Sequence, residues 1–257
     1  MKVHSSSDQG LFGSSLFWLL NRLPYFFEKK LYPSWEIKNI NHGDSAKKDN
    51  IIPGILKPKR VDDLPRRRLN LDTIPAYDFT NFQEANFYFN HYFEFNKEII
   101  QLSKHMSKDF TNTLGIHFRG NDKTTNNHEA ICINKNQFLK KIIEYIKNNK
   151  FESIFISSDE LSLKKFLKEE LSDLTDLKIL CTDLTPTFHL KQQGLDNKLE
   201  LTKSSVAEML ALSKCNHVLK SHSAFSGWAK IINPQIKMYR VNKCKNNWFP
   251  DYYLPEF

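Results

Sequence analysis

The chain of 257 residues is long enough to bury the core of one large domain or of two small ones. It carries 37 basic and 29 acidic residues, and the resulting charge of +8 is spread along the sequence rather than gathered in blocks. Such an excess suits phosphorylated ligands, nucleic acid or an anionic membrane surface, and it does not choose among them. The four cysteines lie far apart and form no C-x-x-C pair, which argues against a zinc ribbon or a redox motif.

The first forty residues are predicted to form a strand, a loop, a helix and a second strand. The three regular elements span 1–4, 14–30 and 35–40. A kink is expected within the helix at Pro24, which cannot donate a backbone hydrogen bond. Gly10 and Gly13 lie where the loop meets the helix N-terminus, a natural place for a ligand, and a tight turn without a ligand is the alternative.

One apolar segment, 11–27, could be mistaken for a membrane anchor. Asn21 and Arg22 interrupt it, and it is shorter than the roughly 20 residues that a bilayer span requires. It is therefore predicted to be a buried amphipathic helix, with a helix on the membrane surface as the alternative. We expect a cytoplasmic protein, either free or peripheral to a membrane.

The middle of the N-terminal half shows little regular pattern. Prolines and two basic runs, 57–60 and 66–68, predict surface loops between 41 and 75. The basic runs are typical of a solvated face, and contact with phosphate or lipid headgroups is the alternative. Residues 79–95 are dense in aromatic side chains, which is more typical of packing against a core than of stacking on sugars or bases. A helix over 96–108 follows.

The second half alternates strands and helices. Strands are predicted over 114–118, 153–157, 177–181, 217–220 and 237–241, and helices over 137–148, 161–171, 205–214 and 224–232. This order predicts a parallel, doubly wound sheet. The polar interval 182–203 is predicted to be an irregular loop. We place a domain boundary near residue 110, which divides the chain into domains over 1–110 and 111–257.

The strand over 114–118 ends in a pattern of polar residues, H-x-R-x-x-D-K, with an acid a little further on: His117, Arg119, Asp122, Lys123 and Glu129. Loops at the carboxyl ends of strands are where open α/β sheets bind ligands. Arg119 offers a permanently charged, planar fork of donors that matches a diphosphate. The alternative is that Arg119 pairs structurally with Asp122 or with another carboxylate.

Two further strand ends carry polar residues. Asp159 and Glu160 could accept hydrogen bonds from a nucleobase edge or a ribose, or could cap the helix that follows. Two adjacent acids are weak support for a metal pair, and we expect no metal. Ser223 and Ser226 lie at the start of a helix, where backbone amides and hydroxyls would form a phosphate cradle, with a simple helix cap as the alternative.

Together these stretches resemble the signatures of the fucosyltransferase group that includes the core N-glycan and nodulation-factor α-1,6-fucosyltransferases, and more distantly the α-1,2- and protein O-fucosyltransferases. IHFRGNDKTTNNHEAICI is similar to a strand followed by H-V-R-R-x-D-K and an E-A pair. FISSDELSL is similar to an apolar strand that ends in T-D-D. SSVAEMLALSKCNHVLKSHSAFSGWAKII is similar to a helix, a strand and a serine-rich loop. The resemblance covers about 113–241.

The resemblance implies a GT-B-like fold of two Rossmann-type domains, with a nucleotide-sugar-binding domain over 111–257 and an acceptor-side domain over 1–110. It implies inverting, metal-independent transfer of fucose from GDP-fucose, without a cofactor, to a glycan acceptor. A transferase that uses another nucleotide sugar is one alternative. A basic protein that binds nucleic acid or a membrane surface is another, although the resemblance itself implies no nucleic-acid partner.

The resemblance also implies roles for single residues. Arg119 matches the arginine at the β-phosphate, His117 a histidine near the nucleotide, and Lys123 and Glu129 the family's lysine and catalytic glutamate. Asp159 or Glu160 matches an acid beside guanine, Ser223 or Ser226 matches a phosphate-side hydroxyl, and Gly10 and Gly13 stand for the glycine-rich first loop. Glu129 is the expected base, with Asp122 in reserve. Gly120 departs from the pattern because it replaces a second arginine, and the gap from Lys123 to Glu129 is two residues longer than in the family.

Overall fold

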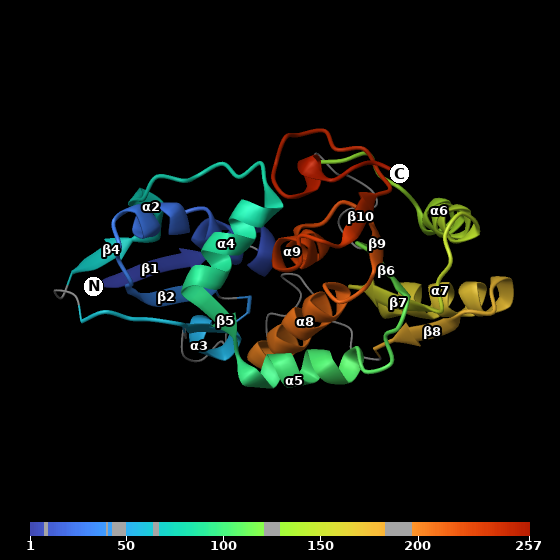
Figure 1. Ribbon diagram of the computed structural model, residues 1–257, viewed down its shortest axis with the longest axis horizontal. Helices are drawn as coiled ribbons and strands as arrows, with labels where there is room; N and C mark the ends of the chain where they lie inside the picture. Colours follow the sequence, from blue (N-terminus) through green and yellow to red (C-terminus); the bar gives the residue numbers. More distant parts are fainter. Residues whose placement is uncertain (8–9, 40, 43–49, 64–66, 121–128, 183–196) are drawn as a thin grey trace. The chain divides into compact units, whose positions relative to one another are not determined.

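The computed structural model describes residues 1–7, 10–39, 41–42, 50–63, 67–120, 129–182 and 197–257 (Figure 1). Within this part the chain divides into two compact units, one of residues 1–102 with 197–206 and the other of 103–182 with 207–257. The division falls inside two helices, α5 (Lys97–Met106) and α8 (Lys198–Leu212).

The first unit is built on a three-stranded parallel sheet with the order β2-β1-β4. Its strands are β1 (Lys2–Ser7), β2 (Ser34–Asn39) and β4 (Arg68–Asn70). Along β2, Trp35, Ile37 and Asn39 are buried and the residues between them are half-buried, because successive side chains of a strand point to opposite faces. A separate antiparallel pair joins β3 (Leu56–Pro58) to β5 (Phe93–Phe95).

The helix predicted over 14–30 is divided in the structure. A π-helix over Leu11–Leu16 leads into α1 (Phe17–Leu20), a turn follows, and α2 (Leu23–Glu28) comes next. The prediction of a kink at Pro24 is therefore wrong: this proline lies in the first turn of α2, where a missing N–H costs no helical hydrogen bond. Much of the segment is buried, as predicted. Among the described residues, no helix has the length and apolar character needed to cross a membrane.

Two stretches that were predicted to lack regular structure contain short elements. After residue 50 the chain forms α3 (Ile52–Ile55), then β3 and β4, and a turn of 3-10 helix over Leu71–Thr73. The strands of three residues are too short to show a period of their own, so pairing with distant strands defines them. In the predicted loop over 182–203, α8 begins at Lys198 rather than at 205. Its first turns bury polar side chains, Lys198 and Thr202, which do not look like an apolar face.

The aromatic stretch forms α4 (Phe82–Tyr92) followed directly by β5. Asn81 caps the helix, since its side chain accepts hydrogen bonds from the backbone amides of Gln83 and Glu84. The buried rings of Phe82, Phe89 and Tyr92 line one side of α4 and pack into the core of the first unit, as the sequence predicted.

The second unit is built on a five-stranded sheet, all parallel, with the order β10-β9-β6-β7-β8. Its strands are β6 (Thr113–Phe118), β7 (Ser153–Ser158), β8 (Lys178–Cys181), β9 (His217–Lys220) and β10 (Lys237–Arg240). The helices between them are α6 (Lys135–Lys147), α7 (Leu161–Leu174), part of α8, and α9 (Ala224–Ile232). The chain runs from β6 outward to β8 and then returns to β9 on the other side of β6. The prediction of a doubly wound parallel sheet is confirmed.

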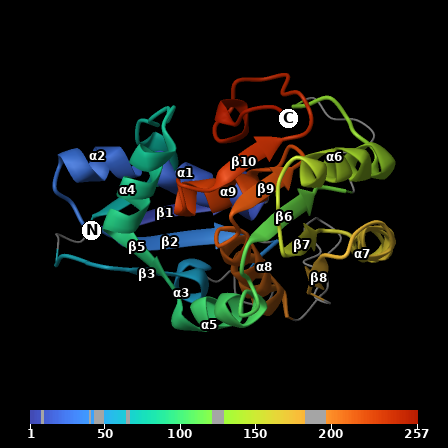
Figure 2. The same cartoon turned by 45° about the vertical axis from the view of Figure 1, so that its right-hand side comes forward.

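Helices cover both faces of this sheet, with α6 and α7 on one side and α8 and α9 on the other (Figure 2). Every second residue of β6 joins the core cluster beneath α6 and α7: Leu114, Ile116 and Phe118. The intervening residues face the other way. A Cβ atom on Gly115 would lie 3.1 Å from Leu212 of α8, and the ring of His117 lies 4.9 Å from that of Phe225 on α9.

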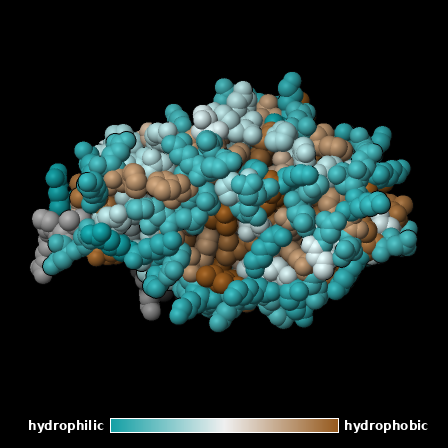
Figure 3. Space-filling model, viewed as in Figure 1, coloured by the Kyte–Doolittle hydropathy of each residue, from teal (hydrophilic) through white to brown (hydrophobic). Residues whose placement is uncertain are grey.

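Charged side chains are spread over the surface. In Figure 3 hydrophilic residues cover much of the visible face and are not gathered on one element. Exposed ion pairs occur in both units, such as Lys57 with Glu94 at 2.9 Å and Lys141 with Glu144 at 3.4 Å. Exposed pairs of this kind contribute at most about 1 kcal/mol each, so the surface charge has little influence on stability.

Helix α9 passes close to the C-terminal segment at Gly227, where an added Cβ would overlap with Cγ of Pro250. We expect Gly227→Ala to lower the free energy of unfolding. Overpacking costs about 1–3 kcal/mol, and overlap with a rigid ring lies at the upper end, above the roughly 1 kcal/mol that alanine gains in a helix. Urea denaturation measures the difference. Gly10→Ala is the control, because no atom of the described residues lies within 4 Å of its added Cβ. Equal stability of the two variants would contradict the close approach.

Candidate active site

The strand order changes direction between β6 and β9, and their carboxyl ends lie side by side. The backbone amide of Ser221, just after β9, donates to the carbonyl of His117 at 2.9 Å. The Ser221 hydroxyl in turn accepts a hydrogen bond from the backbone amide of Arg119 at 2.7 Å. In open α/β sheets, the crevice outside the carboxyl ends of the strands at such a switch point is where ligands bind. The first and third predicted motifs therefore meet at the expected edge of the sheet.

Arg119 forms an ion pair with Asp159, which follows the neighbouring strand β7. Its Nε lies 3.2 Å from Asp159 Oδ2, and the side chains are 12% and 2% exposed. The other carboxylate oxygen, Oδ1, accepts a hydrogen bond from the backbone amide of Gly120 at 2.8 Å. A structural ion pair, the alternative raised for Arg119, is thus present. Nε is one of five N–H donors on a guanidinium, so this pair is compatible with anion binding by the same group.

Glu160 takes a different place from Asp159. It precedes α7 as its N-cap residue, and its own amide donates to the Ser158 hydroxyl at 3.2 Å. Its carboxyl group lies against Gly120, where an added Cβ would overlap with Cδ and Oε1 of Glu160. The position at which the resembling family has a second arginine is therefore a point of close packing, and glycine leaves room for the Glu160 side chain.

His117 is a buried link between β6 and α9. Its side chain is nearly inaccessible, Nδ1 lies 2.9 Å from the Ser226 hydroxyl, and its ring packs on Phe225. Burial holds the pKa of His117 well below its usual 6.5, and the nearby charge of Lys220 lowers it further. The imidazole is neutral near pH 7, so His117 cannot attract a phosphate by charge. Ser226, fully buried, is bonded to it rather than exposed in a cradle.

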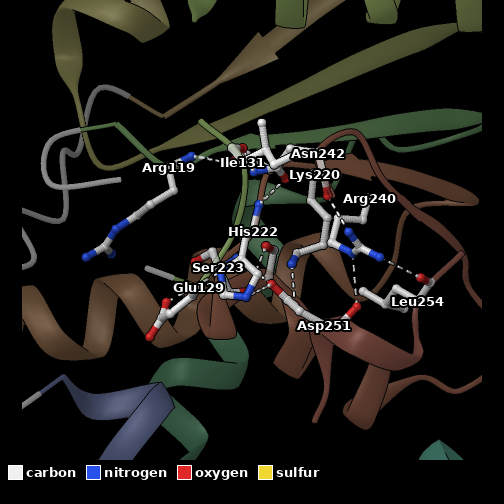
Figure 4. Close-up of polar contacts among 12 residues, drawn as sticks. Arg119, Glu129, Ile131, Lys220, His222, Ser223, Arg240, Asn242, Asp251 and Leu254 are labelled. Atoms are coloured by element: carbon white, nitrogen blue, oxygen red, sulfur yellow. Dashed lines mark hydrogen bonds and ion pairs between the residues drawn. The ribbon is translucent and has the colours of Figure 1, made fainter. Parts of the chain in front are cut away.

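The start of α9 already holds an anion of the protein itself. The amide of Ser223 donates to Asp251 Oδ2 at 2.6 Å, and Lys220 Nζ lies 2.5 Å from Oδ1 of the same carboxylate (Figure 4). All three residues are buried. Burial lowers the pKa of Lys220, and the Asp251 charge opposes this shift. At the N-cap amide, a carboxylate thus lies where the sequence suggested a phosphate.

Glu129 lies beside the same cluster. Its Oε2 is 3.6 Å from His222 Nδ1, and its side chain is 32% exposed. Its backbone is held by the segment after β10: Lys245 donates to the Glu129 carbonyl at 2.7 Å, and Ile131 donates to the Lys243 carbonyl at 2.8 Å. The partly exposed carboxylate therefore stands on a fixed backbone.

Four predicted site residues have not yet been accounted for. Asp122 and Lys123 fall outside the described residues. Gly10 and Gly13 belong to the first unit, where the Gly10 carbonyl accepts a hydrogen bond from Ser14 at 3.1 Å at the start of the π-helix. Among the residues that the structure describes, no group of three or more His, Cys, Asp or Glu side chains could hold a metal ion.

Sequence reasoning missed Asp251 and His222 as parts of this cluster, and with them Asn242, whose side-chain oxygen accepts a hydrogen bond from the His222 amide at 2.8 Å. His222 lay within a quoted motif but was assigned no role. Asp251 lies in an unpatterned C-terminal stretch, 31 residues from Lys220 in the sequence, and no local signal connects the two. The one hint in the sequence is Lys220 at the end of an apolar strand. An ammonium that is buried there needs a carboxylate partner.

The architecture matches solved fucosyltransferases. The NodZ α-1,6-fucosyltransferase soaked with GDP-fucose superposes with a TM-score of 0.56 at 12% identity, over 91% of this chain and 92% of that one. Fucosyltransferase NodZ from Bradyrhizobium gives 0.55 at 12% identity over 91% and 93%, and POFUT1 in complex with GDP-fucose gives 0.56 at 11% over 90% and 93%. No family model matches the sequence, and no curated protein matches it. The chain therefore has a fucosyltransferase-like GT-B fold, which confirms the predicted fold class.

The neutral, buried His117 makes stability depend on pH. Its folded pKa is lowered, so its contribution is fully present above the unfolded value of about 6.5 and is lost as the pH falls below it. We expect the wild-type free energy of unfolding to fall by up to about 1.4 kcal/mol per pH unit from this group, and His117→Phe to remove that slope. Urea denaturation between pH 7.5 and 5 measures both.

The matched control is His217→Phe. His217 lies at the opposite end of the sheet, at the start of β9, and burial lowers its pKa to a smaller degree. This variant should retain most of the wild-type slope. An unchanged slope in His117→Phe would mean that the imidazole takes up its proton over the same pH range in the folded state as in the unfolded state.

Proposed function

We propose that this protein is an inverting glycosyltransferase that transfers fucose from GDP-fucose to a glycan acceptor. The observation that carries the proposal is the position of Arg119, which stands at the switch point of a GT-B sheet beside the loop that follows β9. The solved neighbours that share the fold include NodZ soaked with GDP-fucose and POFUT1 in complex with GDP-fucose. We infer further that the domain over 111–257 binds the donor and that the domain over 1–110 serves the acceptor.

Arg119 is proposed to hold the donor diphosphate. When the bond between the anomeric carbon and the phosphate oxygen breaks, the diphosphate leaves with the electron pair, and a fixed guanidinium stabilises the growing negative charge. Asp159 supports this role, because it holds Nε while its second oxygen holds the Gly120 amide, so that the arginine is oriented before the donor arrives. Neutral His117 and Ser226 have a structural role, because their packing supports the site from within the protein.

Glu129 is proposed as the general base. It would take the proton of the acceptor hydroxyl as that oxygen bonds to the anomeric carbon from the face opposite the diphosphate. Its partial exposure and anchored backbone support the assignment. Asp122 is the reserve base and Lys123 the auxiliary cation. The reaction as proposed uses no metal or other cofactor.

Replacing Arg119 tests the phosphate role. We expect Arg119→Ala to reduce the release of GDP from GDP-fucose by about 100- to 1000-fold, because the lost charge acts mainly in the transition state. Arg119→Lys should recover only part of the rate, since an ammonium lacks the planar fork. Chromatographic detection of GDP, with water or a supplied glycan as the acceptor, measures both variants.

Lys178→Ala is the charge-matched control. Lys178 is exposed, pairs with Asp109, and begins β8 at the amino end of the same sheet, so this variant should keep the wild-type rate. Near-normal GDP release by Arg119→Ala would show that another group holds the diphosphate.

A thermal-shift screen tests the donor class. GDP and GDP-fucose should raise the melting temperature, because a ligand that binds only the folded state stabilises it by about 2.7 kcal/mol at a hundred times its dissociation constant. UDP, CMP and their sugar derivatives should have smaller effects. Preference for one of these would indicate a transferase of another nucleotide sugar. Salt-sensitive binding of DNA or anionic vesicles without a nucleotide response would favour the basic binding protein instead.

A further inference from the structure

His222 lies between two carboxylates in the second unit. Its Nδ1 is 3.6 Å from Glu129 Oε2, and its Nε2 is 3.7 Å from Asp251 Oδ2. Figure 4 shows the ring extending from the end of β9 between these two groups. The imidazole is 9% exposed, so solvent contributes little to orienting it.

The two carboxylates differ in their surroundings. Asp251 is only 4% exposed and is held on both oxygens, by Lys220 Nζ and by the Ser223 amide. Its backbone carbonyl also accepts a hydrogen bond from Arg240 Nε at 3.1 Å. Glu129, at 32% exposed, is the carboxylate open to a substrate. Nε2 of the ring therefore faces a carboxylate that the protein holds in place, and Nδ1 faces the more exposed carboxylate of Glu129.

The backbones of Glu129 and His222 are tied to each other through Asn242. The Asn242 side chain accepts a hydrogen bond from the His222 amide at 2.8 Å and donates one to the Ile131 carbonyl at 2.9 Å. An isolated bridge from Ala130 to Cys244 adds to the attachment. The separation of the two side chains is thus set by the fold, although 3.6 Å is longer than a hydrogen bond. Such contacts in ligand-free sites commonly shorten when the substrate binds.

We propose that His222 is a positioning residue for Glu129. It is supported from behind by the Lys220–Asp251 pair and orients the Glu129 carboxylate toward the acceptor hydroxyl. This inference rests on the proposed function, in which Glu129 is the base. In this role His222 touches neither the donor nor the acceptor. Its loss should therefore reduce the stabilisation of the transition state more than it reduces the affinity for substrate.

The test compares His222→Phe, which keeps a ring without nitrogen atoms, with His222→Asn, whose amide can take the place of Nδ1. We expect His222→Phe to lower kcat for GDP release from GDP-fucose by about 10- to 100-fold, with KM for GDP-fucose nearly unchanged. His222→Asn should recover part of kcat. Adding His222→Phe to Glu129→Gln should cause little further loss, because the histidine acts through the glutamate. His217→Phe, at the start of the strand that precedes His222, should retain the wild-type kcat.

A second measurement does not depend on activity. The side-chain ¹⁵N signals of His222 should move in Glu129→Gln, while those of His217 stay in place. Wild-type kcat in His222→Phe, an additive loss in the double variant, or unmoved His222 signals would each overturn the inference while leaving the proposed function intact. Wild-type protein that neither binds GDP nor releases it from GDP-fucose would show instead that the proposed function has failed, and the inference with it.

Discussion

The ion pair between Arg119 and Asp159 connects the ends of two adjacent strands, and the candidate site depends on it. Both groups are largely removed from water, and such a pair persists only where further hydrogen bonds compensate the loss of hydration. Asp159 has this compensation from the Gly120 amide, and a guanidinium is more weakly hydrated than an ammonium. The first two residues after β6, Arg119 and Gly120, are held by the Asp159 carboxylate, which fixes a permanent positive charge at the switch point.

At the carboxyl end of β9, the buried charges are neutralised in a different way. Around β9 the buried charges are matched within the protein: Lys220 with Asp251, and Asp251 with the first amide of α9. His117 avoids the cost of a buried charge by remaining neutral and bonding to Ser226. These contacts make the β9 side a rigid support, while the side chains of Arg119 and Glu129 are less buried.

The match to NodZ and POFUT1 at 11–12% identity shows how little sequence a GT-B fold requires. In this chain the second unit is encoded by the alternation of buried strands and amphipathic helices. Gly120 illustrates how a local change fits into this frame. Lacking a side chain, it makes room for Glu160, so a departure from the resembling family's pattern coincides with tight packing at the end of β7.

The sequence by itself determined the parallel sheet of the second unit, since short apolar runs alternate along the chain with segments whose apolar residues have helical spacing. It also identified the strand ends at which Arg119, Asp159 and Ser223 lie. Pro24, the short strands β3 and β4, and the early start of α8 could not be foreseen, because their structure depends on pairing and burial rather than on local pattern. Only the tertiary structure decided the partners of the charges. Asp251 reaches Lys220 and His222 through folding alone, because an ion pair depends on distance in space and leaves no periodic trace along the chain.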